Sequence, residues 1–420
     1  MEEISERRIR VLLMPWLAYG HTTAFLELAK RLIERNFYVY FCSTPANLKS
    51  IKSKIPNYGI QVVELHLPSS PELPPHFHTT NGLPHHLKPA LAKTVEQSKS
   101  VYHRILSAIS PDFYVYDYAP CWSVSLADSL RIPSAIFLTV SASVSAFSLF
   151  PDKCKQDYPF PSNYLQKYTN TDENSRKITM HMQNSVLFKT SRVIEGKYLD
   201  MLQSVVRVIP VGTLVGEPDI TEEDGNEILQ WLDRREPSSS VFVSFGSELY
   251  LSKEQIVEIA KGLEMAGVSF VWVLRFDKAE NRKVEDTLPL GFLSRIGETR
   301  GKIVEWAPQT NILRHRSIMG FVSHCGWASV MESMMFGVPI IGMPMEYDQP
   351  FNSKLVENVG VGIEVKRGEH GSITSEEVAR AIRMGTGERI KKKAAEMSLR
   401  LKINKDTEME DAMKEIKQFA

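Results

Sequence analysis

Residues 9–44 read IRVLLMPWLAYGHTTAFLELAKRLIERNFYVYFCST, and this stretch decides the fold class. It opens with the aliphatic run IRVLLMP at 9–15. The segment HTTAFLELAKRLIERN at 21–36 follows, with apolar residues at helical spacing, and FYVYFCST at 37–44 ends the stretch. Strand, amphipathic helix and strand in this order are typical of a parallel βαβ unit. We therefore expect a doubly wound α/β sheet that begins here.

The alternation of apolar runs and amphipathic segments continues beyond this unit. The further elements expected in the first half are a helix at 90–109, a strand at 112–117, a helix at 121–130, and strands at 134–139, 185–190 and 205–212. Residues 150–182 are polar and irregular, which favours a loop with a short helix. Residues 216–227, GEPDITEEDGNE, are acidic and poor in apolar side chains, as in a domain linker.

The second half repeats the pattern and predicts a second sheet. The expected strands are 240–247, 269–276, 302–306, 320–324, 338–344 and 360–365, and the expected helices are 253–265, 328–336 and 348–359, with a helical tail from about residue 374. The predicted fold class is α/β, with two Rossmann-like doubly wound domains. Their expected limits are 1–215 for the N-terminal domain, 216–227 for the linker, 228–400 for the C-terminal domain and 401–420 for a helix that packs back on the N-terminal domain.

Composition excludes several functional classes. Of 420 residues, 43% are hydrophobic and 24% charged, and 50 basic side chains balance 50 acidic ones, so the total charge does not favour nucleic acid or an anionic membrane. The four cysteines form no CxxC pair, which argues against a disulfide framework and a cysteine zinc site. The charged N-terminus lacks the pattern of a signal peptide, and no run reaches about 18 apolar residues. We expect a cytoplasmic monomer without stable membrane insertion.

The turn HCGWASVMES follows a predicted strand and opens a predicted helix. Free N–H groups near Ala328 and Ser329, together with the helix dipole, favour a bound phosphate at such a helix start. The His324 side chain and the Ser329 hydroxyl add donors, and the glycine of SFGS at 244–247 lets a second loop come close. A strand-to-helix turn that merely packs is the competing interpretation of this motif alone.

Three further positions fit a nucleotide sugar. Trp306 follows a strand, where an aromatic ring can stack on a base, and Glu332 lies one helical turn after the phosphate turn, where a carboxylate can accept ribose hydroxyls. Asp348 and Gln349 lie between a strand and a helix and have the groups that bind sugar hydroxyls. Taken singly, a buried tryptophan and a solvated glutamate explain these residues equally well.

These residues together carry a resemblance. The segment 306–349, from WAPQ to EYDQ, resembles the signature box of plant secondary-product UDP-glycosyltransferases (family 1, inverting). PWLAYGH at 15–21, PDFYVYD at 111–117 and SFGS at 244–247 are also similar to this family, so that the resemblance covers nearly the whole chain. It implies a GT-B fold, in which two Rossmann-like domains face each other across a cleft.

The resemblance also implies the roles of individual residues at the donor. Trp306 would stack on uracil, Gln309 would lie near the nucleoside and Glu332 would hold the ribose. His324 and Ser329 would bind the diphosphate. The residues expected around the sugar are Trp327, Asp348 and Gln349, and the other expected donor-binding residues are Thr139, Ser247, Ala307, Gly326 and Ala328. A final Gln in the box is similar to members that use glucose, which makes UDP-glucose the expected donor.

Catalysis is expected from the first domain. By the resemblance, His21 is the general base that takes the proton of the acceptor hydroxyl, and Asp117 hydrogen-bonds the far imidazole nitrogen. Direct attack would invert the anomeric carbon and give a β-glycoside. No DxD metal motif accompanies the diphosphate turn, so we expect no metal and no cofactor besides the donor substrate.

The chain departs from the family pattern at some positions. Ala24 stands where a proline is usual, VGTL at 211–214 replaces VGPL, and Ala328 occupies the place of an asparagine. Loss of that amide predicts weaker donor binding by about 0.5–1.5 kcal/mol. The main alternative function is a catalytically weakened or inactive protein that binds UDP-sugars and glycosides.

The acceptor is less well defined. The segment 65–84, LHLPSSPELPPHFHTTNGLP, resembles members that extend a sugar chain on a flavonoid or terpenoid glycoside. We expect a small lipophilic acceptor or glycoside, and transfer to an aglycone and to an attached sugar both stay open. Four histidines, His76, His78, His85 and His86, lie in this segment and directly after it. A solvated or acceptor-lining loop is a better interpretation of them than a zinc site.

Other enzyme classes fit less well. A dehydrogenase requires G-x-G-x-x-G after the first strand, and LAYGHTTAF does not supply this spacing. A UDP-sugar epimerase or hydrolase on the same scaffold would need carboxylates of its own at the sugar and no hydrophobic acceptor pocket.

Overall fold

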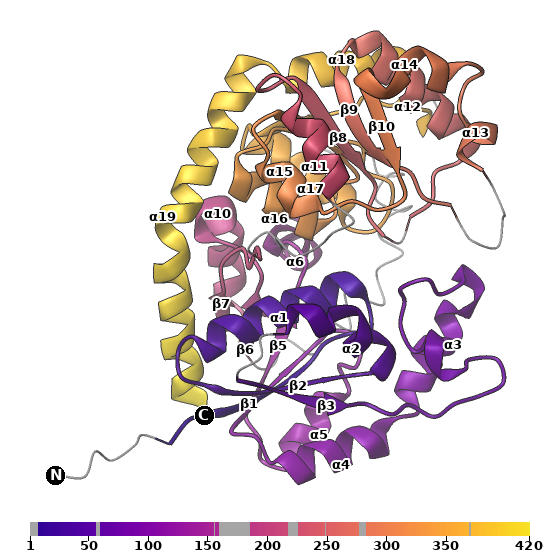
Figure 1. Cartoon of the computed structure of the whole chain (residues 1–420). Helices are drawn as coiled ribbons and strands as arrows, with labels where there is room; N and C mark the ends of the chain where they lie inside the picture. Colours follow the sequence, from indigo (N-terminus) through magenta and orange to yellow (C-terminus); the bar gives the residue numbers. More distant parts are fainter. Residues whose placement is uncertain are drawn as a thin grey trace. The chain divides into compact units, whose positions relative to one another are not determined.

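The computed structural model describes residues 7–55, 59–154, 156–158, 185–216, 226–247, 249–276, 283–368 and 371–420. The chain forms two compact units. Unit 1 comprises Met1–Lys153, Ser162–Leu214 and Asn404–Ala420, and unit 2 comprises Cys154–Pro161 and Val215–Ile403. Each unit is built on one sheet of parallel strands (Figure 1).

The sheet of unit 1 has seven strands in the order β3-β2-β1-β4-β5-β6-β7. The strands are β1 (Arg10–Met14), β2 (Tyr38–Ser43), β3 (Ile60–Glu64), β4 (Phe113–Tyr116), β5 (Ser134–Leu138), β6 (Ser185–Phe188) and β7 (Val208–Pro210). The strand order reverses between β1 and β4, which both pair in parallel. Ligands of doubly wound sheets bind at the carboxyl ends of the strands at such a switch point.

Helices cover both faces of this sheet. They are α1 (Tyr19–Ile33), α2 (Pro45–Ile51), α3 (Lys88–Glu96), α4 (Lys99–Ile109), α5 (Ser123–Ser129), α6 (Ala142–Leu149), α7 (Pro151–Cys154) and α10 (Arg192–Gln203), with short 3-10 turns η1 (Lys52–Lys54), η2 (Pro75–Phe77) and η3 (His85–Leu87). In Figure 1, α1 and α2 lie on one face, and α4 and α5 lie on the other.

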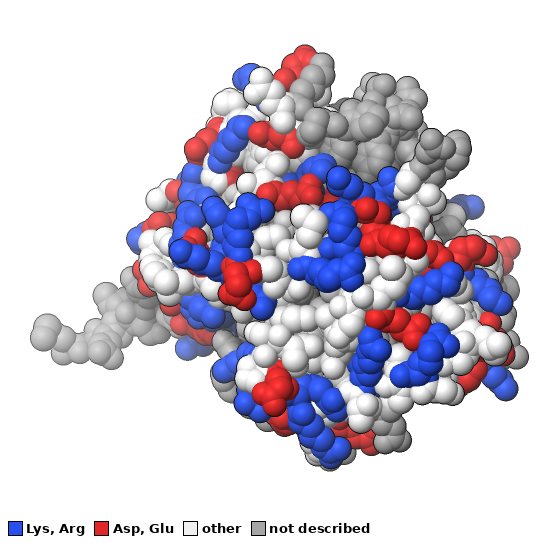
Figure 2. All heavy atoms as spheres, turned by 90° about the horizontal axis from the view of Figure 1, so that it is seen from above, with Lys and Arg blue, Asp and Glu red and all other residues white. Residues whose placement is uncertain are grey.

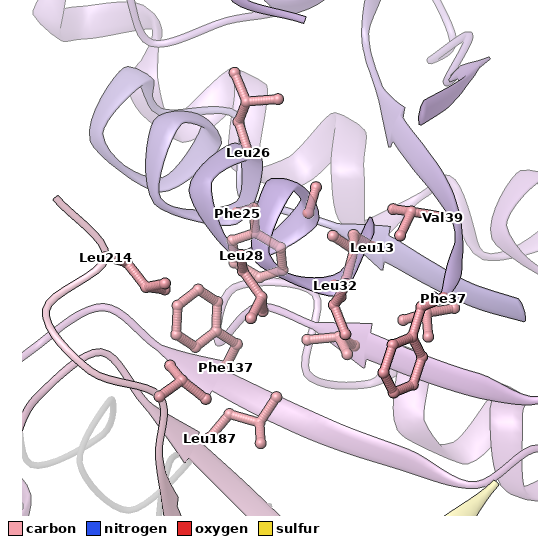
Figure 3. Close-up of a cluster of buried hydrophobic side chains, with 14 of the residues drawn as sticks. Leu13, Phe25, Leu26, Leu28, Leu32, Phe37, Val39, Phe137, Leu187 and Leu214 are labelled. Atoms are coloured by element: carbon pink, nitrogen blue, oxygen red, sulfur yellow. The ribbon is translucent and has the colours of Figure 1, made fainter. Parts of the chain in front are cut away.

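The core beneath α1 explains why this helix docks where it does. Phe25, Leu28 and Leu32 recur at helical spacing, and all three are fully buried against the sheet (Figure 3). The Phe25 ring meets the Phe137 ring of β5 edge to face, with 4.9 Å between centroids. Each such side chain contributes about 1.5–3 kcal/mol through burial, so α1 is held firmly over β1 and β5.

The C-terminal helix α19 (Glu388–Phe419) completes the core of unit 1. Its apolar residues Met409, Ala412, Met413 and Ile416 are buried in the same cluster as the α1 side chains. The Phe419 ring stacks on Phe113 of β4, with 5.9 Å between centroids. The end of the chain is therefore an integral part of the N-terminal unit.

Unit 2 has a six-stranded sheet in the order β10-β9-β8-β11-β12-β13. The strands are β8 (Ser240–Ser244), β9 (Ser269–Val273), β10 (Gly301–Val304), β11 (Ile318–Ser323), β12 (Ile340–Gly342) and β13 (Gly362–Glu364), and the helices before α19 are α11 (Asn226–Asp233), α12 (Lys253–Ala266), α13 (Val284–Thr287), α14 (Phe292–Arg300), α15 (Gln309–Arg314), α16 (Trp327–Phe336), α17 (Gln349–Asn358) and α18 (Ser375–Gly385). One hydrophobic cluster joins the sheet to α12 and α18, and another joins it to α11 and α15. Here the strand order reverses between β8 and β11.

The predicted fold class, two doubly wound α/β sheets, is confirmed. Some element boundaries were wrong. The helix expected at 90–109 is two helices, α3 and α4, which are separated where the Ser98 hydroxyl donates to the Thr94 carbonyl oxygen at 2.7 Å. Strand β3 was not predicted, because only Ile60 of its residues is buried.

Two predicted segments lie largely outside the described residues. Within the expected linker 216–227, residues 217–225 are not described, and Asn226 begins α11. Within the irregular segment 150–182, the structure describes α7 and residues 156–158. No bilayer-spanning helix occurs in the described part of the chain. On the face shown in Figure 2, acidic and basic side chains lie among uncharged ones.

Candidate active site

His21 lies in the first turn of α1, directly beyond the carboxyl end of β1. The helix begins two residues earlier than predicted, at Tyr19, because Thr22 N–H donates to the Ala18 carbonyl at 2.9 Å. The Nδ1 atom of His21 lies 2.9 Å from Oδ2 of Asp117. The two residues that the sequence proposed as base and partner are thus in direct contact.

Asp117 follows β4 immediately, so that it meets His21 at the switch point between β1 and β4. Its side chain is completely buried. Trp16 N–H donates to Oδ2 at 2.9 Å, and Tyr118 N–H donates to Oδ1 at 2.7 Å. A buried carboxylate is stable when donors satisfy its oxygens. These backbone donors fix the carboxylate as a hydrogen-bond acceptor for His21.

Thr139 follows β5, and its Oγ1 atom lies 3.2 Å from Nδ1 of His21. The sequence assigned Thr139 to the donor, and the structure places it beside the imidazole within unit 1. Because the Asp117 carboxylate only accepts hydrogen bonds, Nδ1 carries the ring proton, and Nε2 is the basic nitrogen of the neutral ring. The arrangement selects the tautomer that a general base requires.

In unit 2, α16 starts directly after the turn that follows β11. Its N-cap is Gly326, which offers no side-chain cap, and its first turn contains no acidic residue. The first amides of a helix have no partner within the helix. Those of Trp327, Ala328 and Ser329 occupy this position, so the end of α16 can bind an anion.

His324 lies between two glycines at the switch point of the second sheet. A Cβ atom on Gly246 would lie 2.7 Å from Nε2 of His324, and one on Gly326 would lie 2.5 Å from it. Gly246 also has φ +78°, which favours glycine. The Nδ1 atom of His324 is buried without a hydrogen-bond partner among the described residues. Burial lowers the pKa of His324 to about 4, so that the ring is neutral at pH 7.

One side chain joins the residues predicted for ribose and diphosphate. Nε2 of Gln309, the first residue of α15, donates to Ser329 Oγ at 2.9 Å and to Glu332 Oε2 at 2.6 Å. Trp306 has 48% of its surface exposed, as an aromatic platform requires, whereas Trp327 is buried with 3% exposed. Ala307 packs at the edge of the core that contains α11 and α15.

The EYDQ loop is braced at both ends. Oε1 of Gln349 accepts hydrogen bonds from Met345 N–H at 2.9 Å and Glu346 N–H at 3.0 Å. Nδ2 of Asn352 donates to Asp348 Oδ2 at 2.8 Å and to the Cys325 carbonyl at 3.0 Å. Asn352 thereby ties this loop to the HCGW turn. Sequence reasoning missed Asn352, although its spacing of one helical turn from Asp348 was a usable signal.

The remaining predicted positions have simpler surroundings. Ser247 is exposed, and its carbonyl oxygen accepts a hydrogen bond from Arg275 Nη1 at 3.3 Å. In the histidine-containing loop, His78 is 3% exposed and its Nε2 atom has no partner in the described structure. The described residues contain no group of three or more His, Cys, Asp or Glu side chains placed to hold a metal ion.

Two family descriptions match the chain. Residues 7–209 match the N-terminal domain of glycosyltransferases, and residues 220–413 match the family UDP-glucoronosyl and UDP-glucosyl transferase. The crystal structure of Glycyrrhiza uralensis UGT73P12, complexed with glycyrrhetinic acid 3-O-monoglucuronide, superposes with a TM-score of 0.88 at 23% identity, over 98% of this chain and 96% of that one. This likeness establishes the GT-B type of fold.

Characterised relatives extend over almost the whole chain. Mogroside IIIx synthase of Siraitia grosvenorii is 48% identical, over 97% of this chain and 92% of the relative. Beta-D-glucosyl crocetin beta-1,6-glucosyltransferase of Gardenia jasminoides is 43% identical, over 95% of this chain and 96% of the relative. The contact between His21 and Asp117, the turn at α16 and these relatives agree: the chain is an enzyme that belongs to the plant family 1 UDP-glycosyltransferases.

Proposed function

We propose that this enzyme transfers glucose from UDP-glucose, with inversion, to a hydroxyl of a small lipophilic glycoside of the terpenoid or flavonoid class. The observation that carries the proposal is the contact between His21 Nδ1 and the buried Asp117 carboxylate. Family membership favours turnover over the non-catalytic binder that Ala328 suggested.

The reaction uses the basic Nε2 atom of His21. It accepts the proton of the acceptor hydroxyl while that oxygen attacks C1 of the sugar. The bond between C1 and the diphosphate oxygen breaks, UDP leaves with the electron pair, and an α-linked donor gives a β-glycoside. Asp117 stabilises the imidazolium that forms. General-base catalysis of this kind contributes roughly 10²–10⁴-fold in rate.

Unit 2 supplies the donor site in this proposal. The start of α16, neutral His324 and Ser329 donate hydrogen bonds to the diphosphate, which stabilises the leaving group without a metal ion. Trp306 stacks on uracil through its exposed face, and Glu332 accepts the ribose hydroxyls. Gln309 holds Ser329 and Glu332 at a fixed separation, because one amide bonds both.

Glucose is proposed from the EYDQ loop. Oε1 of Gln349 is occupied by two backbone amides, so its Nε2 atom is the group that would donate to a sugar hydroxyl. Asp348, oriented by Asn352, would accept from a neighbouring hydroxyl. A donor and an acceptor side by side suit adjacent equatorial hydroxyls of glucose.

A glycoside acceptor is supported by the loop that contains residues 65–84. The backbone of Thr80 donates to the Leu17 carbonyl at 2.8 Å, and the Thr79 hydroxyl donates to Asn47 Oδ1 at 2.6 Å. The first bond fastens the loop to the segment that leads into α1 and His21, and the second fastens it to α2. The name of the Gardenia relative states transfer onto a glucosylated acceptor. A loop that contacts a sugar already attached to the acceptor would suit such a reaction.

The test is a mass-spectrometric screen of terpenoid and flavonoid monoglucosides, each beside its aglycone, with UDP-glucose and UDP-galactose as donors. We expect one added hexose on monoglucosides and faster turnover with UDP-glucose. Release of UDP without acceptor would instead indicate a hydrolase, and UDP binding without any product would indicate the binder.

His21→Ala should abolish transfer and leave the Kd for UDP unchanged in calorimetry. His103→Ala, at an exposed histidine of α4, is the matched control and should keep full turnover. Full activity of His21→Ala would overturn the assignment of the base.

A further inference from the structure

Glu195 is a completely buried carboxylate that the mechanism above does not use. It lies in α10 and accepts three hydrogen bonds. Ala142 N–H donates to it at 2.9 Å, Ser143 N–H at 2.8 Å and the Thr190 hydroxyl at 2.7 Å. The three donors fix the position of this buried carboxyl group, and the carboxyl group in turn fixes the residues that donate to it.

The carboxylate caps helix α6 from a distant part of the chain. Ser141, the N-cap residue, has extended backbone angles but makes no side-chain cap bond. Glu195 takes the first two free amides of the helix instead. Burial raises the pKa of Glu195, and these hydrogen bonds together with the helix dipole oppose that rise. The backbone of α10 is non-helical at Glu195 itself, with φ −122° and ψ 21°, which turns this side chain out of the regular helix path.

The loop before α6 is short and carries Thr139. At its first end, β5 is paired with β6, and Lys189 N–H donates to the Leu138 carbonyl at 3.0 Å. At its second end, Glu195 fixes Ala142. Between these two anchors, Thr139 Oγ1 lies 3.2 Å from Nδ1 of His21. The position of this hydroxyl thus depends on both anchors.

We propose that Glu195 is a positioning residue for the reaction: it fixes the start of α6 and thereby holds the Thr139 hydroxyl as a second acceptor, beside Asp117, for the proton on Nδ1 of His21. The proposal rests on the proposed role of His21 as base. Thr139 assists Asp117 in orienting the ring, and Glu195 acts only through Thr139.

The chemistry of the anchor requires a carboxylate. Its two oxygens meet two N–H donors and one hydroxyl. In a glutamine, one oxygen would be replaced by an NH2 group, which would face an N–H donor. Glu195→Gln therefore keeps the volume and loses one anchor bond, which frees the start of α6.

The experiment measures the tautomer of His21 directly. Nitrogen-15 spectra of histidine-labelled full-length enzyme distinguish a protonated Nδ1 from a protonated Nε2, and the His21 signals are assigned by their loss in His21→Ala. We expect the Nδ1–H tautomer in the parent enzyme and a measurably larger fraction of the Nε2–H tautomer in both Glu195→Gln and Thr139→Val, because Asp117 then accepts the Nδ1 proton without Thr139. If the tautomer stays unchanged in Glu195→Gln, the proposal is overturned, whatever happens to the rate.

Kinetics provide the second readout. Each single variant should lower kcat about tenfold with unchanged KM for UDP-glucose, and the double variant should be no slower than Thr139→Val, since coupled residues are not additive. Multiplied effects in the double variant would show that Glu195 does not act through Thr139, against the proposal. A changed tautomer with unchanged kcat would uphold the positioning and count against His21 as base.

Glu258→Gln is the matched control. Glu258 of α12 accepts from Ser375 N–H at 2.8 Å at the start of α18, so it bonds a helix start from another element as Glu195 does, but both partners lie in unit 2. We expect it to lower the melting temperature without changing the His21 tautomer or kcat. If Glu195→Gln does not fold, Thr190→Val removes one of the three anchor bonds and should produce the same tautomer change in smaller measure.

Discussion

The proposed catalytic site in unit 1 and the proposed donor site in unit 2 differ in how their polar groups are bonded. In unit 1, protein donors surround Asp117, and His21 is held by Asp117 and Thr139. In unit 2, the described structure gives no hydrogen-bond partner to His324 Nδ1 or to Asn352 Oδ1, and Trp306 presents nearly half its surface. The hydrogen bonds of Asp117 are made within the protein, whereas the residues of the proposed donor site include buried polar atoms that have no partner in the described structure.

This difference fits the two tasks that we propose, general-base catalysis in unit 1 and donor binding in unit 2. A base must have the right tautomer and orientation before the substrate arrives, so its orienting bonds are made within the fold. A binding site gains affinity when a ligand satisfies buried polar groups, each of which costs about 1–3 kcal/mol when unpaired. We therefore expect changes in unit 1 to act on kcat and changes in unit 2 to act on donor affinity and on stability.

The largest expected effect is that of Asp117→Asn. The amide cannot accept from His21, Trp16 and Tyr118 as the carboxylate does, so the wrong tautomer of His21 becomes populated. We expect kcat to fall by roughly 10²–10⁴-fold, with the Kd for UDP unchanged in calorimetry. Asp128→Asn, at an exposed carboxylate of α5, is the control. A higher Kd for UDP in Asp117→Asn would contradict the expectation that changes in unit 1 act on kcat alone.

The stability of the protein at acidic pH should depend on the buried, neutral side chain of His324. Because its pKa is lowered to about 4 from 6.5, its contribution to stability is fully present above pH 6.5 and is lost as the pH falls toward 4. That loss amounts to about 3 kcal/mol at most. We expect the urea midpoint of the parent enzyme to fall further between pH 7 and pH 4.5 than that of His324→Gln. Equal falls in both proteins would contradict a buried neutral ring.

Gly246→Ala, compared with a second glycine, should separate backbone strain at a positive φ from the steric contact with His324. The new Cβ would lie 2.7 Å from His324 Nε2, and the positive φ adds about 1–2 kcal/mol of strain. Gly267→Ala is the matched control, because Gly267 has φ +75° but open space around it. We expect a larger loss of melting temperature in Gly246→Ala than in Gly267→Ala, and roughly tenfold weaker UDP binding in Gly246→Ala alone. Equal Kd values for UDP in both variants would show that contact with His324 does not affect UDP binding.

The smallest expected effect is that of Ala328→Asn. A new amide at the start of α16 adds one neutral hydrogen bond to the donor, worth about 0.5–1.5 kcal/mol. We expect a lower KM for UDP-glucose, by about 2- to 10-fold, and little change in kcat. An unchanged KM would show that this position does not limit donor binding.

The sheets were largely predictable because their central strands are buried on both faces and read as continuous apolar runs. Strands β4 and β5 are buried throughout. Edge strand β3 gives no such signal, since Gln61 and Val62 are exposed. The break between α3 and α4 was also hidden, because helical periodicity runs on through Ser98.

The candidate site was predictable where the family motif names a residue, as for His21 and Asp117. The contact of Thr139 with His21 was not foreseen, because it joins residues 118 positions apart. Glu195 gave no signal at all. A single glutamate in an amphipathic helix is typical of a solvated face, and two of its three partners lie at a helix start more than 50 positions away.

The placement of Met409, Met413 and Ile416 in the core of unit 1 bears on how the protein is made. The ribosome adds these residues after the whole of unit 2. A nascent chain that has reached Leu214 thus contains every strand of the first sheet but lacks apolar side chains that cover it. We expect this intermediate to need chaperones during translation, and a fragment ending at Leu214 to aggregate when it is expressed alone.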